Sequence, residues 1–70
     1  MNKLEDAKLW IGKAIDNGGK GNATLLEHYG DVMFKLGNTE EALNYWINAQ
    51  KIGGASNLID KKIADKKLYE

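Results

Sequence analysis

The chain has 70 residues with ten lysines, ten acidic residues, no arginine and no cysteine, so its formal net charge is zero. This length allows one small domain, and 43% hydrophobic with 29% charged residues is typical of a folded chain. A balanced charge without arginine argues against a nucleic-acid-binding surface, and the lack of cysteine excludes disulfides and thiolate metal ligands. No apolar run approaches the roughly 18–20 residues that a membrane-spanning helix requires.

Glycine marks the breaks between the predicted elements. Glycines occur at residues 18, 19 and 21, at 37, and at 53 and 54, and Asn, Ser or Thr follows each break. The segments between the breaks contain no proline, and their β-branched residues do not alternate as those of a strand do. We therefore predict helices over 3–17 and 56–69 and a pair of helices within 23–54.

The first segment repeats its apolar residues at three- and four-residue steps, as one face of a helix does. The residues on this stripe are Leu4, Ala7, Trp10, Ile11, Ala14 and Ile15. We expect Trp10, like Tyr45 and Trp46 further along, to pack between helices rather than to form a stacking platform for bases or sugars. The glycine-rich residues 17–22 are expected to form a flexible connector.

The second and third segments carry equivalent stripes. Their apolar residues are Leu25, Leu26, Tyr29, Val32, Met33 and Leu36, then Ala42, Leu43, Tyr45, Trp46, Ala49 and Ile52. The fourth segment is the most polar, and its lysines are expected to form a solvated face: Lys61, Lys62, Lys66 and Lys67. Short connections make neighbouring helices antiparallel, so the prediction is an all-α fold of stacked helical hairpins.

The chain also shows an internal repeat. Residues 5–7 align with residues 40–42 at an offset of 35, and two helices fill this period. The middle of the chain carries a motif that consists of Leu26, Tyr29, Gly30, Met33, Gly37, Ala42, Trp46 and Ala49. This motif resembles the tetratricopeptide repeat, in which small residues let two helices approach and large residues fill the space between them. Gly54 stands where that family usually has proline.

The resemblance implies an α-α superhelix in a single domain over residues 1–70. Residues 3–17 are similar to the second helix of a partial repeat, 23–54 to a complete repeat and 56–69 to a C-terminal capping helix. The ending is similar to those of tetratricopeptide proteins from Bacteroidetes-type bacteria, so we expect the chain to be a fragment of a longer array. Because a helix before residue 3 is missing on this interpretation, we expect self-association through Leu4, Trp10 and Ile11.

Tetratricopeptide arrays bind peptides or partner proteins on the concave face made by the first helix of each pair. Carried over to this chain, the partner-binding residues are Thr24, Glu27, Asp31, Phe34, Lys35, Leu58, Lys61 and Asp65. Glu27 and Asp31 lie four residues apart, which places them on one helical face and favours a basic partner. The resemblance therefore implies a non-enzymatic interaction scaffold without a cofactor or catalytic residues.

Two alternatives stay open at the level of sequence. In the first, the chain is a structural C-terminal cap of a longer superhelix and has no ligand site of its own. In the second and more remote, Glu27, His28 and Asp31 form a small metal-dependent site, because all three can coordinate a cation at helical spacing.

Overall fold

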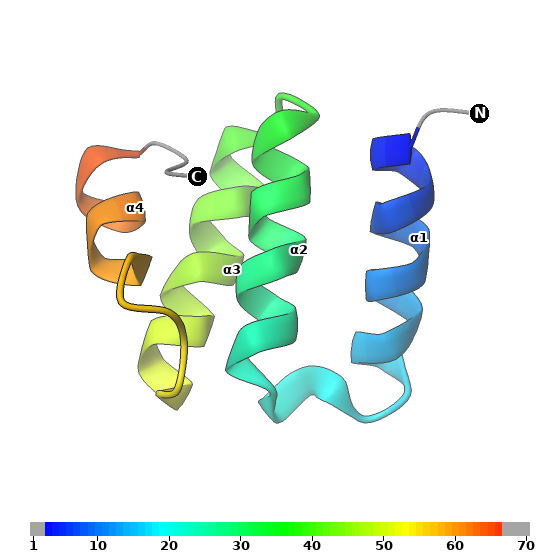
Figure 1. The fold of residues 1–70 in the computed structure, drawn as a ribbon, viewed down its shortest axis with the longest axis horizontal. Helices are drawn as coiled ribbons and strands as arrows, with labels where there is room; N and C mark the ends of the chain where they lie inside the picture. The colour runs from blue at the N-terminus through cyan, green and yellow to red at the C-terminus, as the bar shows by residue number, and fades with distance from the viewer. Residues whose placement is uncertain (1–2, 67–70) are drawn as a thin grey trace.

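The computed structural model describes residues 3–66, and these residues form four α-helices and one short 3-10 helix without any strand. The helices are α1 (Lys3–Asp16), η1 (Gly19–Gly21), α2 (Ala23–Lys35), α3 (Thr39–Ile52) and α4 (Ile59–Asp65). Figure 1 shows α1, α2 and α3 running in alternating directions, as their short connections predict. The predicted all-α fold is confirmed for the described part of the chain.

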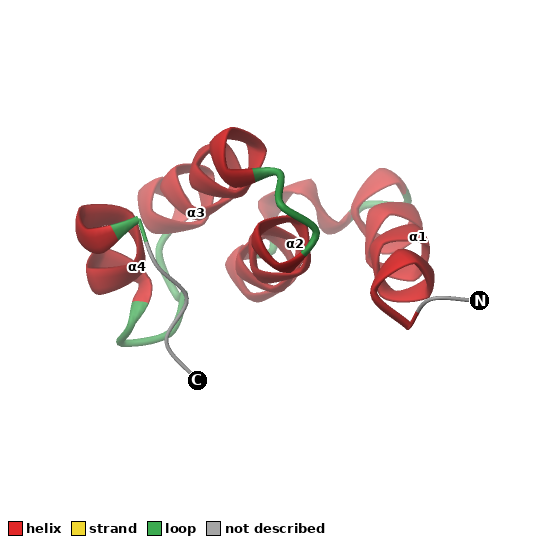
Figure 2. Cartoon of the chain, turned by 90° about the horizontal axis from the view of Figure 1, so that it is seen from above, coloured by secondary structure: helices red, strands yellow, loops and turns green. Residues whose placement is uncertain are grey.

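The helices stand side by side in chain order as an open row (Figure 2). The tightest contact is between α2 and α3, while α1 packs on the other side of α2 and α4 packs on α3. α3 therefore has a helix on each side, whereas the main contacts of α1 are with α2 and with the connector that leads to it.

The core lies between α2 and α3, where small residues let the two helices approach. Ala42, Trp46 and Ala49 of α3 are completely buried, and Met33 of α2 is 2% exposed. A Cβ atom added to Gly30 would lie 2.6 Å from the Trp46 ring and 3.1 Å from the Ala42 carbonyl oxygen. Any side chain at position 30 would thus meet the indole, which confirms the predicted close approach at this glycine.

The connector between α1 and α2, expected from the sequence to be a flexible loop, contains the η1 turn. Gly18 adopts φ 117°, and the buried Gly19 packs where a Cβ atom would lie 2.8 Å from the Ala14 carbonyl oxygen. The side chain of Asn22 then accepts a hydrogen bond from the backbone N–H of Leu25 at 3.2 Å and caps α2. Glycine and asparagine thus fix this turn through a left-handed residue, a close contact and a helix cap.

α4 is shorter than predicted. It begins at Ile59 instead of residue 56, and it ends before Lys66, whose φ is 50°, while residues 67–69 lie outside the described part of the chain. Gly53 and Gly54 precede it with φ of 87° and 90°. Since proline fixes φ near −65°, position 54 requires glycine in this loop, which explains the departure from the tetratricopeptide pattern.

Candidate functional site

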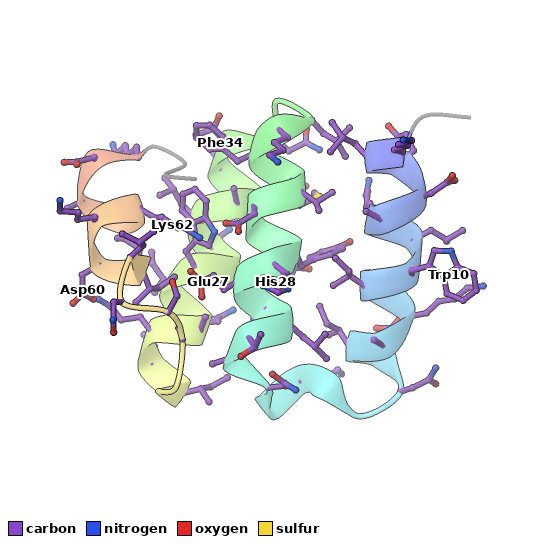
Figure 3. The ribbon with its side chains drawn as sticks, in the orientation of Figure 1. Trp10, Glu27, His28, Phe34, Asp60 and Lys62 are labelled. Carbon is purple, nitrogen blue, oxygen red and sulfur yellow. The ribbon has the colours of Figure 1, made fainter. Side chains whose placement is uncertain are left out.

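A buried lysine of α4 joins that helix to α2. Lys62 is 4% exposed, and its Nζ donates a hydrogen bond of 2.8 Å to Glu27 Oε2 and one of 2.9 Å to Asp31 Oδ1. Figure 3 shows Lys62 on α4 and Glu27 on the facing side of α2. An ammonium group that is removed from water needs such partners, and two carboxylates supply them.

The loop before α4 completes the coordination of Glu27. The backbone N–H of Ser56 donates to Glu27 Oε1 at 2.8 Å, and the Ser56 hydroxyl donates to Glu27 Oε2. Glu27 is only 3% exposed, so its carboxylate exchanges water for three donors of the protein. The described part of the chain contains no buried side-chain nitrogen or oxygen without a partner.

Trp46 links this polar group to the hydrophobic core. Its Nε1 donates a 3.0 Å hydrogen bond to Asp31 Oδ1, and Phe34 stacks on its ring with centroids 5.6 Å apart. Lys62 Nζ lies 5.9 Å from the same ring centre, within reach of a cation–π attraction. We call Glu27, Asp31, Trp46, Ser56 and Lys62 the Lys62 cluster.

Opposing effects set the charge states of the cluster. Burial alone would raise the pKa of Glu27, but hydrogen bonds from Lys62 and Ser56 outweigh it and hold that pKa below its ordinary value of 4.5. Burial likewise works against the charged form of Lys62, yet its bonds to Glu27 and Asp31 raise the pKa above 10.5. Both residues are therefore charged at neutral pH, and the cluster is an internal ion pair.

The sequence identified the acidic half of the cluster but missed the basic half. We expected Lys62 in a solvated face, and this expectation is wrong because Lys62 points into the protein. One signal was available: Lys62 follows the buried Ile59 by three residues and precedes the half-buried Ile63 by one, so it lies on the apolar stripe of α4. A lysine on such a stripe indicates an internal carboxylate partner.

The residues predicted for the concave face separate into two groups. Glu27 is buried beneath Lys62 and Ser56, so its carboxylate does not lie on the surface where we expected a partner to contact it. Asp31 is half-buried within the Lys62 cluster, and Phe34 is half-buried against the Trp46 ring. The others are exposed: Thr24, Lys35, Leu58, Lys61 and Asp65.

The structure does not bring Glu27, His28 and Asp31 together as metal ligands. His28 is exposed, whereas the Glu27 carboxylate is hydrogen-bonded to Ser56 and Lys62. Residues 3–66 contain no group of three or more His, Asp or Glu side chains arranged to hold a metal ion. The metal-site alternative thus fails, because the amine of Lys62 occupies the position at which a cation would meet the two carboxylates.

The exposed face of α1 differs from the face that we predicted. Trp10 is 70% exposed and points away from α2 (Figure 3), so the expectation that it packs between helices is wrong. Ile11 packs against the core, and Leu4 is half-buried. The second large exposed residue is Leu9 at 57%, which the apolar stripe of the sequence did not include.

A groove of about 520 Å³ runs along α1 beside Tyr29 of α2. Leu9 and Gly12 lie on its wall, together with carboxylates and lysines of α1. Tyr29 makes an edge-to-face contact with Tyr45 at 4.6 Å between ring centroids, and burial raises the pKa of both phenols. The groove lies away from the Lys62 cluster, and the neutral phenol of Tyr29 that lines it is suited to contact rather than to proton transfer.

Comparisons with protein-family models, with curated proteins and with solved structures produced no match. The resemblance to tetratricopeptide repeats thus remains a prediction that depends on the residues of this sequence. Over residues 3–66, the structure has no helix whose length and hydrophobicity would suit a membrane span.

Proposed function

We propose that the chain is a non-enzymatic protein-interaction module of the tetratricopeptide type, in which α4 acts as a structural cap. The observation that supports the capping form is the burial of Glu27 and Lys62 against each other. The acidic pair that the sequence assigned to a basic partner is already bound to a lysine of the same chain. This part of the α2 surface therefore holds α4 in place.

The length of α4 strengthens this interpretation. An isolated helix of seven residues is too short to be stable in water, so tertiary contacts must hold α4 in place. Ile59 supplies a buried apolar contact, Gln50 of α3 donates a 2.7 Å hydrogen bond to Asp60, and Lys62 supplies the ion pairs. The ion pairs fix where α4 lies, because burying the ammonium elsewhere would leave it without partners.

A cap should protect the α2–α3 core, and hydrogen exchange of the full chain tests this. We expect Lys62→Ala to remove the amide protection of α4 and to reduce that of α3 around Trp46. The matched control is Lys51→Ala, which removes an exposed lysine at the end of α3. Loss of protection confined to α4, with α3 as protected as before, would contradict the capping role.

A second candidate is peptide binding on the same face, with a basic partner. It is supported by the exposed Thr24, Leu58, Lys61 and Asp65, which remain on the surface around the cluster, and by the affinity of the acidic pair for an amine. A basic peptide would have to displace Lys62. Fluorescence titration with a labelled lysine-containing peptide should therefore show tighter binding to Lys62→Met than to the wild type, and no binding to either protein rejects this candidate.

A further inference from the structure

The outward side of α1 carries the two most exposed large hydrophobic side chains of the described chain. Leu9 is 57% exposed and Trp10 is 70% exposed. At about 100° per residue, the residues opposite the buried Ile15 are Asp6, Leu9, Trp10 and Lys13. We call these four the outer stripe. Adjacent exposed apolar side chains flanked by charges are typical of an interaction surface.

The outer stripe is complementary to itself when two copies of α1 pair antiparallel. If a two-fold axis passes midway between residues 9 and 10, residue n faces residue 19 − n of the second copy. Leu9 then meets Trp10 of the second copy, and Asp6 meets Lys13. Each of these contacts occurs twice, so the apolar pair lies at the centre with an opposite-charge pair on each side.

The same register continues to the ends of the helix. Residue 3 faces residue 16, so Lys3 lies opposite Asp16 of the second copy, and both side chains are exposed. A parallel pairing would instead place Asp6 on Asp6 and Lys13 on Lys13, which is repulsive. Antiparallel helix dipoles also attract each other. The order of charges along α1 thus selects one orientation.

We propose that the outer stripe is a self-association surface, through which two copies of the chain form a symmetric dimer by antiparallel pairing of α1. This surface replaces the Leu4, Trp10 and Ile11 face expected from the sequence, because Ile11 already packs against the core. The proposal goes beyond the proposed function and does not depend on it, since the Lys62 cluster lies at the other end of the helix row.

The expected dimer is weak. Each tryptophan buries about 150–250 Å² at most, so two copies of Leu9 and Trp10 provide less area than the roughly 1,200–2,000 Å² of a standard interface. We expect a dissociation constant on the order of 100 µM. A dimer of this strength is half formed at a concentration that analytical ultracentrifugation reaches easily.

Sedimentation equilibrium of the full chain between about 10 µM and about 1 mM tests the surface. Trp10→Ala should weaken dimerisation at least about ten-fold, because it removes the largest apolar contact. Ile52→Ala is the matched control: Ile52 is 46% exposed but lies on α3, so the dissociation constant should stay within about two-fold. A wild-type chain that is monomeric throughout, or equal effects of the two substitutions, would overturn the proposal.

Charge reversal tests the register. Asp6→Lys and Lys13→Asp should each weaken dimerisation about ten-fold, since each places like charges opposite one another. An equimolar mixture of the two variants should dimerise again, because every facing pair of the mixed dimer then has opposite charges. Circular dichroism verifies that both variants keep their helix content. A mixture that associates no better than either variant alone would refute the antiparallel pairing.

Discussion

α1 and α3 carry the same pattern of small and large residues at an offset of 35, but the two helices lie in different surroundings. On α3, Ala42, Trp46 and Ala49 are completely buried. On α1, the residues at the corresponding positions, Ala7, Ile11 and Ala14, are only half-buried. Since α3 packs closely against both α2 and α4, whereas the main helix contact of α1 is with α2, the difference shows that neighbours rather than pattern determine burial.

The largest expected effect comes from truncating the large side chains at the two corresponding positions, Trp46 of α3 and Ile11 of α1. Trp46→Ala should destabilise the protein by about 3–5 kcal/mol, because it empties the core and also removes the hydrogen bond to Asp31. A domain of this size has few kcal/mol in reserve, so the variant should be largely unfolded. Ile11→Ala should cost only about 1–2 kcal/mol, because its side chain is half-buried.

Urea unfolding followed by circular dichroism measures both changes. Val32→Ala, at a half-buried position of α2, is a useful control for truncation of an apolar side chain in general. Equal losses for Trp46→Ala and Ile11→Ala would mean that α1 is covered as completely as α3 in solution, and the comparison between the two helices would fail.

Substitutions at two glycines compare the tight α2–α3 contact with the looser α1–α2 contact. Gly30→Ala should destabilise by about 1–3 kcal/mol, since the new methyl group would overlap the Trp46 ring and press on the Ala42 carbonyl. Gly12→Ala on α1 should instead stabilise by up to about 1 kcal/mol, because its Cβ would meet Tyr29 at an ordinary 3.6 Å and alanine favours the helix. Thermal unfolding of the two variants gives both signs, and a gain for Gly30→Ala would contradict the tight α2–α3 contact.

The same distinction explains what the sequence could predict. Local patterns identified the four helices, and the small residues Gly30, Ala42 and Ala49 marked the tight contact, because periodicity and residue size act within one hairpin. The cluster at Lys62 depends on a contact between residues 27 and 62, far apart in the chain. The position of Lys62 on the apolar stripe of α4 indicates that this lysine faces inward, but the carboxylates that it reaches depend on how the loop at Gly53 and Gly54 returns the chain.

The two tryptophans also show that the sequence pattern does not determine burial. Trp10 and Trp46 both lie on apolar stripes with alanines nearby, yet one is 70% exposed and the other is completely buried. Trp46 is enclosed by Phe34 and Gly30 of α2 and by Lys62 of α4, so its cover comes from other elements. An apolar stripe predicts which face of a helix is hydrophobic. Whether another element packs on that face and buries the side chain depends on the whole fold.

The smallest expected effect is the pH dependence of stability that results from the buried charges of Glu27 and Lys62. Because the pKa of Glu27 lies below its ordinary 4.5, Glu27 stabilises the fold above about that pH, and this contribution disappears as the pH falls through the lower value of the native state. Because the pKa of Lys62 lies above 10.5, its contribution is complete below that pH and is lost as the pH rises through the native value.

Stability should therefore fall on both the acid and the alkaline side. Glu27→Gln should be less stable at neutral pH and should lose less stability between about pH 5 and about pH 3, because the group that is protonated there is gone. Lys62→Met should flatten the alkaline side in the same way. If Glu27→Gln instead retained the acid dependence of the wild type, the acid-sensitive group would lie elsewhere, and the ion pair between α2 and α4 would not be what couples proton binding to folding.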